Sequence, residues 1–193
     1  MTPVQTSGTE LQIDFSFSGH KQTVYQIDIP PDEYQAAEAA ACKWWSNSKR
    51  GTYGRGILAT EDDPYATCRV GILGQVALAK FLGLDTDLTY RHQGDDFDFL
   101  VNGKTVDLKT ASHRSFGVYI TAQRNGYDLP LTKDVYAAAY LKSEDRQNKT
   151  AVVVLVGWAT KEEVARLTPR KSRYGNWYNR ELEFVETHPI GEL

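Results

Sequence analysis

Two aspartates and a lysine are spaced along the chain in a way that suits phosphodiester chemistry. The dipeptide Asn102-Gly103, which favours a two-residue type I′ turn, lies between the segments FDFLVN and KTVDLK, so the sequence predicts a β-hairpin. In that hairpin Asp98 stands directly opposite Asp107, and Lys109 follows Asp107 by two positions. Because side chains alternate between the two faces of a strand, all three share one face.

The facing carboxylates indicate a divalent cation. Like charges at directly opposed strand positions destabilise a sheet. Mg²⁺, for which Mn²⁺ substitutes, relieves that repulsion and binds one or two carboxylates together with water and phosphate. Such an ion polarises a phosphoryl oxygen, while the Lys109 ammonium orients the attacking water, helps to deprotonate it, or stabilises charge developing on phosphorus. The alternative is a solvated hairpin face on which Asp96 and Lys109 form a surface ion pair of little energetic weight.

The sequence leaves the roles of four neighbouring residues open. Asp96 shares the face of the pair, whereas Asp95 points away from it or lies in the loop that enters the strand. His113 and Arg114 follow the second strand within reach of a phosphate. For His113, an ordinary place in a surface loop is the simpler interpretation.

The segment GDDFDFLVNGKTVDLKT resembles the core of the PD-(D/E)xK nuclease superfamily, which has the restriction-endonuclease-like fold. Asp98 matches the first acid of the family's motif, and Asp107-Leu108-Lys109 matches its D/E-x-K. The preceding helix of this family often carries G-x-x-G-E, and this chain has GILGQ, with Gln75 in place of the glutamate. A phenylalanine precedes Asp98, where the motif often has proline.

This resemblance spans about residues 64–160 and implies a Mg²⁺-dependent deoxyribonuclease, with an endonuclease as the main expectation. It implies that Asp98, Asp107 and the Leu108 backbone carbonyl hold the metal, and that Gln75 offers an amide oxygen without negative charge. A catalytically weak or inactive DNA-binding module is therefore the alternative, and RNA stays open as a substrate. A homodimer is a further expectation, because members of the family often cut both strands as dimers. The third class of function is a structural or interaction protein, in which the Asn-Gly hairpin is incidental.

Residues 42–60 and 166–180 are basic, free of acids and rich in aromatic residues. Basic groups contact phosphates and aromatic planes stack on exposed bases, so DNA is the expected partner. Packing of the tryptophans against the core is the alternative for the aromatic residues. With one arginine after the D/E-x-K strand, the candidates for nucleic-acid contact are Lys43, Lys49, Arg50, Arg55, Arg114, Arg170, Lys171 and Arg173.

The chain has 193 residues, with 22 lysines and arginines against 25 aspartates and glutamates, for a net charge of −3. This length favours one domain, and the slight acidity argues against indiscriminate coating of nucleic acid. No apolar run approaches the roughly 18–20 residues that cross a bilayer, and the N-terminus lacks the features of a signal peptide. We therefore expect a cytoplasmic protein without a membrane partner. Cys42 and Cys68 are expected to be buried small apolar residues.

The elements around these residues predict an α/β fold, bordering on α+β, in which helices flank one central mixed sheet. Residues 1–60 are expected to form an N-terminal extension. It contains a hairpin of strands at 11–17 and 23–29, followed by a helix from Pro31 to about Trp45.

The nuclease-like core is expected to begin with a helix that Asp63 caps, Pro64 opens and Gly83 ends. Gly71 and Gly74 each cost a helix interior about 1 kcal/mol relative to alanine, so we expect this helix to approach another backbone closely. The strands expected after the Asn-Gly hairpin are residues 117–121, 133–141 and 151–159.

Residues 161–193 are expected to complete the domain with a short helix, a basic loop and a final strand. Thr160 and Glu163 have the spacing of a capping box, which predicts a helix through about Leu167. The final strand is expected near 181–186.

Overall fold

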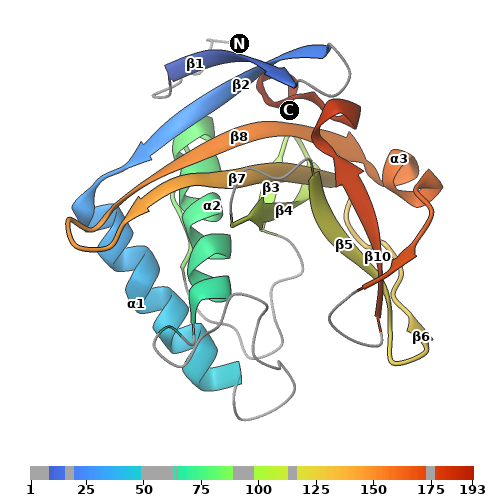
Figure 1. The fold of residues 1–193 in the computed structure, drawn as a ribbon, viewed down its shortest axis with the longest axis horizontal. Helices are drawn as coiled ribbons and strands as arrows, with labels where there is room; N and C mark the ends of the chain where they lie inside the picture. The colour runs from blue at the N-terminus through green and yellow to red at the C-terminus, as the bar shows by residue number, and fades with distance from the viewer. Residues whose placement is uncertain are drawn as a thin grey trace.

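A mixed β-sheet runs through the middle of the molecule (Figure 1). The computed structural model describes residues 9–15, 20–48, 63, 65–88, 98–112, 117–172 and 177–193. The strand order of this main sheet is β1 (Thr9–Phe15), β2 (His20–Ile29), β8 (Thr150–Thr160), β7 (Val135–Asp145), β4 (Lys104–Ala111) and β3 (Phe99–Val101), with β11 (His188–Pro189) paired to β8. Strands β4 and β7 are parallel, and the other described pairs of this sheet are antiparallel.

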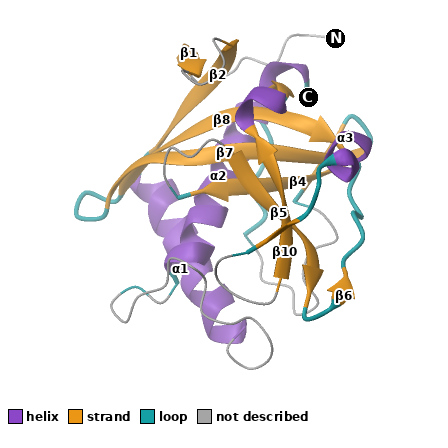
Figure 2. Cartoon of the chain, turned by 45° about the vertical axis from the view of Figure 1, so that its right-hand side comes forward, coloured by secondary structure: helices purple, strands orange, loops and turns teal. Residues whose placement is uncertain are grey.

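A second, four-stranded sheet covers one face of the main sheet. Its antiparallel strands follow the order β6 (Tyr127–Asp128), β5 (Gly117–Arg124), β10 (Trp177–Glu183) and β9 (Arg170–Lys171). Val118, Ile120 and Leu182 of this sheet are buried in one cluster with Tyr140 and Val154 of the main sheet. Figure 2 shows β5 and β10 running across the strands of the main sheet.

The second sheet corrects the expectation of a single sheet flanked by helices. The segment predicted as a strand at 117–121 does form β5, but in the second sheet. Alternating buried residues predict a strand with one covered face, and they do not specify which sheet the strand joins.

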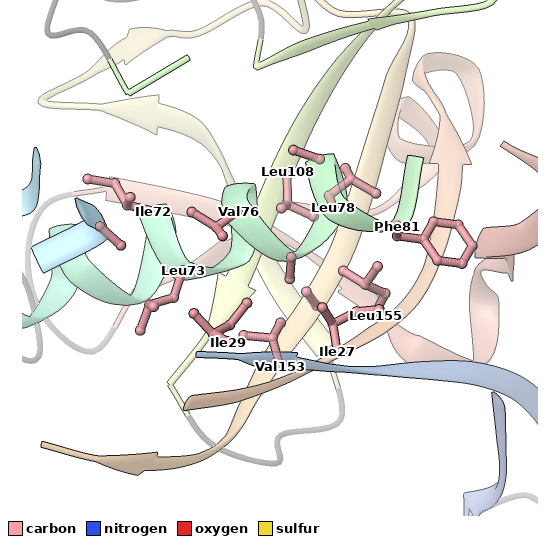
Figure 3. Close-up of a cluster of buried hydrophobic side chains, with 14 of the residues drawn as sticks. Ile27, Ile29, Ile72, Leu73, Val76, Leu78, Phe81, Leu108, Val153 and Leu155 are labelled. Atoms are coloured by element: carbon pink, nitrogen blue, oxygen red, sulfur yellow. The ribbon is translucent and has the colours of Figure 1, made fainter. Parts of the chain in front are cut away.

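Helices α1 (Pro31–Ser48) and α2 (Ala66–Leu82) lie on the opposite face of the main sheet. Figure 3 shows the packing: side chains of α2 lie against strands β2 and β8. The labelled side chains are Ile27, Ile29, Ile72, Leu73, Val76, Leu78, Phe81, Leu108, Val153 and Leu155. No helix of the described residues is long and apolar enough to span a membrane.

The start of α2 differs from the prediction. The helix begins at Ala66, and its N-cap is Tyr65, whose side chain makes no capping hydrogen bond. The carboxylate of Asp63, the expected cap, instead pairs with the Arg69 guanidinium at 2.6 Å, and the proline after Asp63 lies outside the described residues. Gly83 ends the helix in the left-handed conformation, with φ of 66°, as predicted.

The two glycines of α2 have different surroundings. A methyl group at Gly74 would overlap the side chain of Thr110 on β4, so the glycine permits a close approach of helix and strand. The approach is to a side chain, whereas the sequence predicted a backbone. A methyl group at Gly71 would meet no atom within 4 Å, so the described structure offers no packing reason for that glycine.

A buried arginine joins the two helices to the main sheet. Arg69 of α2 is 2% exposed and binds Asp63 and, at 2.7 Å, Glu144 of β7. The Tyr34 hydroxyl of α1 donates to the same Glu144 at 2.7 Å, and Arg146 lies 3.1 Å from Asp63. Both acids and the arginine are therefore paired, which a buried ionic group requires.

The C-terminal part contains the predicted capping box. In α3 (Lys161–Arg166) the Thr160 hydroxyl accepts from the Glu163 N–H, and the Glu163 carboxylate accepts from the Thr160 N–H. The strand expected near 181–186 is β10, which begins earlier than predicted, at Trp177. After it come the 3₁₀ helix η1 (Phe184–Glu186), the short strand β11 and the 3₁₀ helix η2 (Ile190–Glu192).

The cysteines differ from expectation. Cys42 is exposed and Cys68 is half-buried, and both are free thiols. Cys42 lies on a solvent-facing position of α1, so its expected burial is wrong, while burial raises the pKa of the Cys68 thiol.

Candidate active site

The β3–β4 hairpin has the predicted register. Leu100 pairs with Thr105, and Val101 pairs with Lys104. Both turn residues have positive φ, 50° at Asn102 and 79° at the glycine that follows, as a type I′ turn requires. The Asn-Gly signal therefore located this hairpin correctly.

Asp98 does not occupy the position opposite Asp107 that this register predicts. The paired ladder stops at Phe99, and the Asp98 N–H donates to the Val106 carbonyl at 2.9 Å, although Val106 already pairs with Phe99. Two residues of one strand then face one of the other, which is the hydrogen bonding of a β-bulge. A bulge changes the direction of the side chain at its position, and this is the physical reason for the difference.

Among the described residues, Leu108 and Gln75 both donate hydrogen bonds to the Asp98 carboxylate. Its Oδ2 accepts from the backbone N–H of Leu108 at 2.7 Å, and its Oδ1 accepts from Nε2 of Gln75 at 2.9 Å. The Leu108 nitrogen belongs to the peptide bond that follows Asp107. The carboxylate of Asp98 therefore lies against the backbone of the D-x-K tripeptide, and Gln75 reaches it from α2.

Asp107 and Lys109 form an ion pair on the face of β4 that points toward the second sheet. The Lys109 Nζ lies 2.6 Å from Oδ2 and 2.7 Å from Oδ1 of Asp107, with side chains 37% and 17% exposed, respectively. The alternate residues Val106 and Leu108 are buried in the core beneath α2. Strand alternation thus separates the ion pair from that core.

The ion pair lines a hollow of about 190 Å³ between the two sheets. The other lining residues are Ile120, Thr121, Pro130, Leu131, Thr132, Lys133 and Tyr136. A small, partly polar hollow beside an acid and a lysine suits a hydrated ion or one substrate group.

Tyr136 is a site residue that the sequence did not single out. It pairs with Asp107 across the parallel β4–β7 ladder, and its hydroxyl accepts from the Lys133 N–H at 3.5 Å. Burial raises the pKa of the Tyr136 phenol above its usual value, and the negative charge of Asp107 raises it further. The phenol therefore stays protonated near neutral pH. Its place beside Asp107 depends on the pairing of two strands that are distant in sequence.

The donor set fits a Mg²⁺ ion bound by two carboxylates at most. No group of three or more His, Cys, Asp or Glu residues that could hold a metal is found within the described ranges. Mg²⁺ needs fewer protein ligands, because it keeps waters and takes phosphate oxygens. Asp98, Asp107 and the Leu108 carbonyl supply oxygen donors on either side of the Leu108 backbone, and that carbonyl points to the same side of β4 as the Leu108 N–H that binds Asp98.

The described candidates for nucleic-acid contact, Lys43, Arg170 and Lys171, do not lie on one surface. Lys43 is exposed on α1, whereas Arg170 and Lys171 are exposed on β9, on the opposite face of the main sheet. Arg170 lies 3.9 Å from Glu181. The other candidates of the sequence analysis lie outside the described residues: Lys49, Arg50, Arg55, Asp95, Asp96, His113, Arg114 and Arg173.

The candidate active site thus consists of two adjoining parts. Gln75, Asp98 and Leu108 are joined by hydrogen bonds at the helix side, and Asp107 and Lys109 are paired at the side of the second sheet. Comparisons of the chain with models of protein families, with characterised proteins and with solved structures found no match.

Proposed function

We propose that the chain is a metal-dependent nuclease that hydrolyses DNA phosphodiester bonds, acting as an endonuclease on a restriction-endonuclease-like core. One observation carries the proposal: the Asp98 carboxylate binds the peptide N–H between Asp107 and Leu108, while Lys109 binds Asp107. Two acids and a lysine, the groups that phosphodiester hydrolysis needs, are thereby held at one short segment of β4.

Each residue has a proposed role. Asp98, Asp107 and the Leu108 carbonyl would hold Mg²⁺ or Mn²⁺, which supplies positive charge to polarise the phosphoryl oxygen. Lys109 now donates to Asp107, and its ammonium can instead donate to the attacking water or to an oxygen on phosphorus. Gln75 orients the Asp98 carboxylate.

Nicking of supercoiled plasmid tests the proposal. We expect the wild-type protein to nick plasmid with Mg²⁺ or Mn²⁺ and to stop when EDTA is added. Asp107→Asn should lower the rate by about 100-fold or more, because it removes a carboxylate that is needed in the transition state. Asp85→Asn, at an exposed position after α2, is the matched control and should leave the rate unchanged. Equal nicking rates for the two variants would contradict the assignment of Asp107 to the active site.

The Gln75–Asp98 hydrogen bond favours a second candidate, a catalytically weak or inactive DNA-binding module on the same fold. An amide that donates to Asp98 brings no negative charge to the site, so metal binding would be weak. This candidate predicts DNA binding that persists in EDTA and no nicking with any divalent cation. A labelled RNA in the same assay tests RNA as the substrate, and sedimentation tests a homodimer.

A further inference from the structure

Arg180 of β10 lies on the inner face of the second sheet. It pairs with Ile120, and the next inner pair is Leu182 with Val118. The side chains of Ile120, Leu182 and Val118 are buried between the two sheets. Because paired residues of adjacent strands share a face, Arg180 also points toward the space between the sheets.

Two nitrogens of the Arg180 guanidinium are buried without a partner in the part of the chain that the structure describes. Nε and Nη1 are covered by protein, and neither has a hydrogen-bond partner among those residues. Arginine stays charged at all ordinary pH values, and a covered charge without acceptors is unfavourable. The fold therefore keeps a cation here without satisfying it, which indicates that an anionic ligand supplies the missing interaction.

Arg180 lines a groove of about 790 Å³ beside the candidate active site. Lys161 and Tyr178 line the same groove. Pro130 and Leu131 line both this groove and the smaller hollow of the Asp107–Lys109 ion pair, so the two spaces share a wall.

The charges of the groove and its aromatic residue, Tyr178, suit a nucleic-acid strand. Its lining acid is Asp128, which accepts from Gln123 at 3.0 Å, against the two cations Lys161 and Arg180. Tyr178 is 38% exposed. Cations that contact phosphates beside an aromatic plane that stacks on a base are the features of single-strand binding.

We infer that this groove binds one single-stranded segment of nucleic acid, with a phosphodiester on Arg180 and Lys161 and a base on Tyr178. The inference rests on the proposed function for the placement of the strand next to Asp107 and Lys109. Binding in the groove is measured separately from cleavage, so the two proposals fail in different assays.

Fluorescence anisotropy with a labelled oligothymidylate in EDTA tests the inference. Arg180→Met should weaken binding by about fivefold or more and lower the dependence of binding on salt by about one phosphate contact. Its melting temperature should stay the same or rise, because the variant removes an unsatisfied cation. The control is Lys142→Gln, which removes one exposed positive charge near the C-terminal end of β7. This variant should bind like the wild type.

If Arg180→Met fails to fold, Lys161→Gln and Tyr178→Leu test the inference instead, since Lys161 and Tyr178 are both exposed. Each should weaken binding by about threefold or more. Wild-type affinity in the folded variants, an equal loss in Lys142→Gln, tighter binding of duplex than of single strands, or no binding by the wild type would overturn the inference. If the variants bind more weakly but the wild-type protein nicks no DNA, the inference of a binding groove is supported and the proposed nuclease function is wrong.

Discussion

The carboxylate of Asp98 accepts a 2.7 Å hydrogen bond from the backbone N–H of Leu108. This contact places the acid beside the peptide bond that follows Asp107, although Asp98 has left the paired ladder of the hairpin. The bulge at Asp98 thus keeps the acid near the D-x-K segment and turns it toward Gln75 on α2.

Gln75→Glu should convert the site into a stronger metal site. Without metal, the new carboxylate repels Asp98 and the Nε2–H donor is lost, so the melting temperature should fall. With Mn²⁺ the melting temperature should recover and the affinity for Mn²⁺ should rise by about tenfold or more. Differential scanning fluorimetry with a Mn²⁺ titration measures both effects.

The control for this prediction is Gln123→Glu, since Gln123 also donates through Nε2 to an acid, Asp128, but in a hydrogen bond that is exposed to solvent. Its melting temperature should not depend on Mn²⁺. If both variants respond to Mn²⁺ alike, Gln75 is not next to a metal site.

Lys109→Met should separate catalysis from metal binding. The ammonium now pairs with Asp107, so its removal frees that carboxylate, and Mn²⁺ affinity should stay the same or increase. Cleavage should fall by about 100-fold or more, because a group that acts on the attacking water or on phosphorus is lost. Lys104→Met, at an exposed position of the same strand, should cleave normally. A normal rate for Lys109→Met would remove the lysine from the mechanism.

Arg69→Met should destabilise the fold severely. It leaves Asp63 and Glu144, with side chains 12% and 17% exposed, without their buried cation. Breaking a buried ion pair by removing one partner costs about 3–5 kcal/mol. Urea unfolding measures the loss, and a change below about 1 kcal/mol would show that the network contributes little.

The same network predicts acid sensitivity. Hydrogen bonds from Arg69 lower the pKa of Asp63 below its usual value. Because folding lowers this pKa, the contribution of Asp63 to stability is complete above the unfolded value of about 4 and is lost as the pH falls through the folded value. Urea unfolding from pH 7 to pH 3 should show a smaller acid loss for Asp63→Asn than for wild type. Identical pH dependence in the two proteins would refute the linkage.

Replacing the two glycines of α2 by alanine should change the stability of the protein in opposite directions. Gly74→Ala forces its methyl group against Thr110 and should cost about 1–3 kcal/mol, partly recovered when Thr110→Ala is added. Gly71→Ala enters open space and should stabilise the helix by about 0.5–1 kcal/mol. Equal effects at both positions would contradict the helix–strand contact.

Local signals in the sequence predicted the local structure well. Asn-Gly located the β3–β4 turn, Gly83 ended α2, and the Thr160–Glu163 capping box opened α3. In each case the determining interaction joins residues a few positions apart, so the sequence contains all of its parts.

Long-range packing was not predictable in the same way. The second sheet depends on β5 pairing with β10, more than fifty residues later, and the bulge at Asp98 depends on hydrogen bonds to Val106 and Leu108 that replace regular pairing. Neither hydrophobic alternation nor turn residues determine these contacts. For the same reason the sequence grouped Asp98 with Asp107 on one face, whereas Asp98 turns toward Gln75.

Mn²⁺ calorimetry on a double-mutant cycle tests most directly whether Asp98 and Asp107 act on one ion. We expect each of Asp98→Asn and Asp107→Asn to lower the Mn²⁺ affinity by about tenfold or more, which is about 1.4 kcal/mol. The double variant should lose little more than either single variant, because ligands of one ion are not independent. Wild-type affinity in Asp98→Asn, or losses that add fully in the double variant, would contradict a shared metal site.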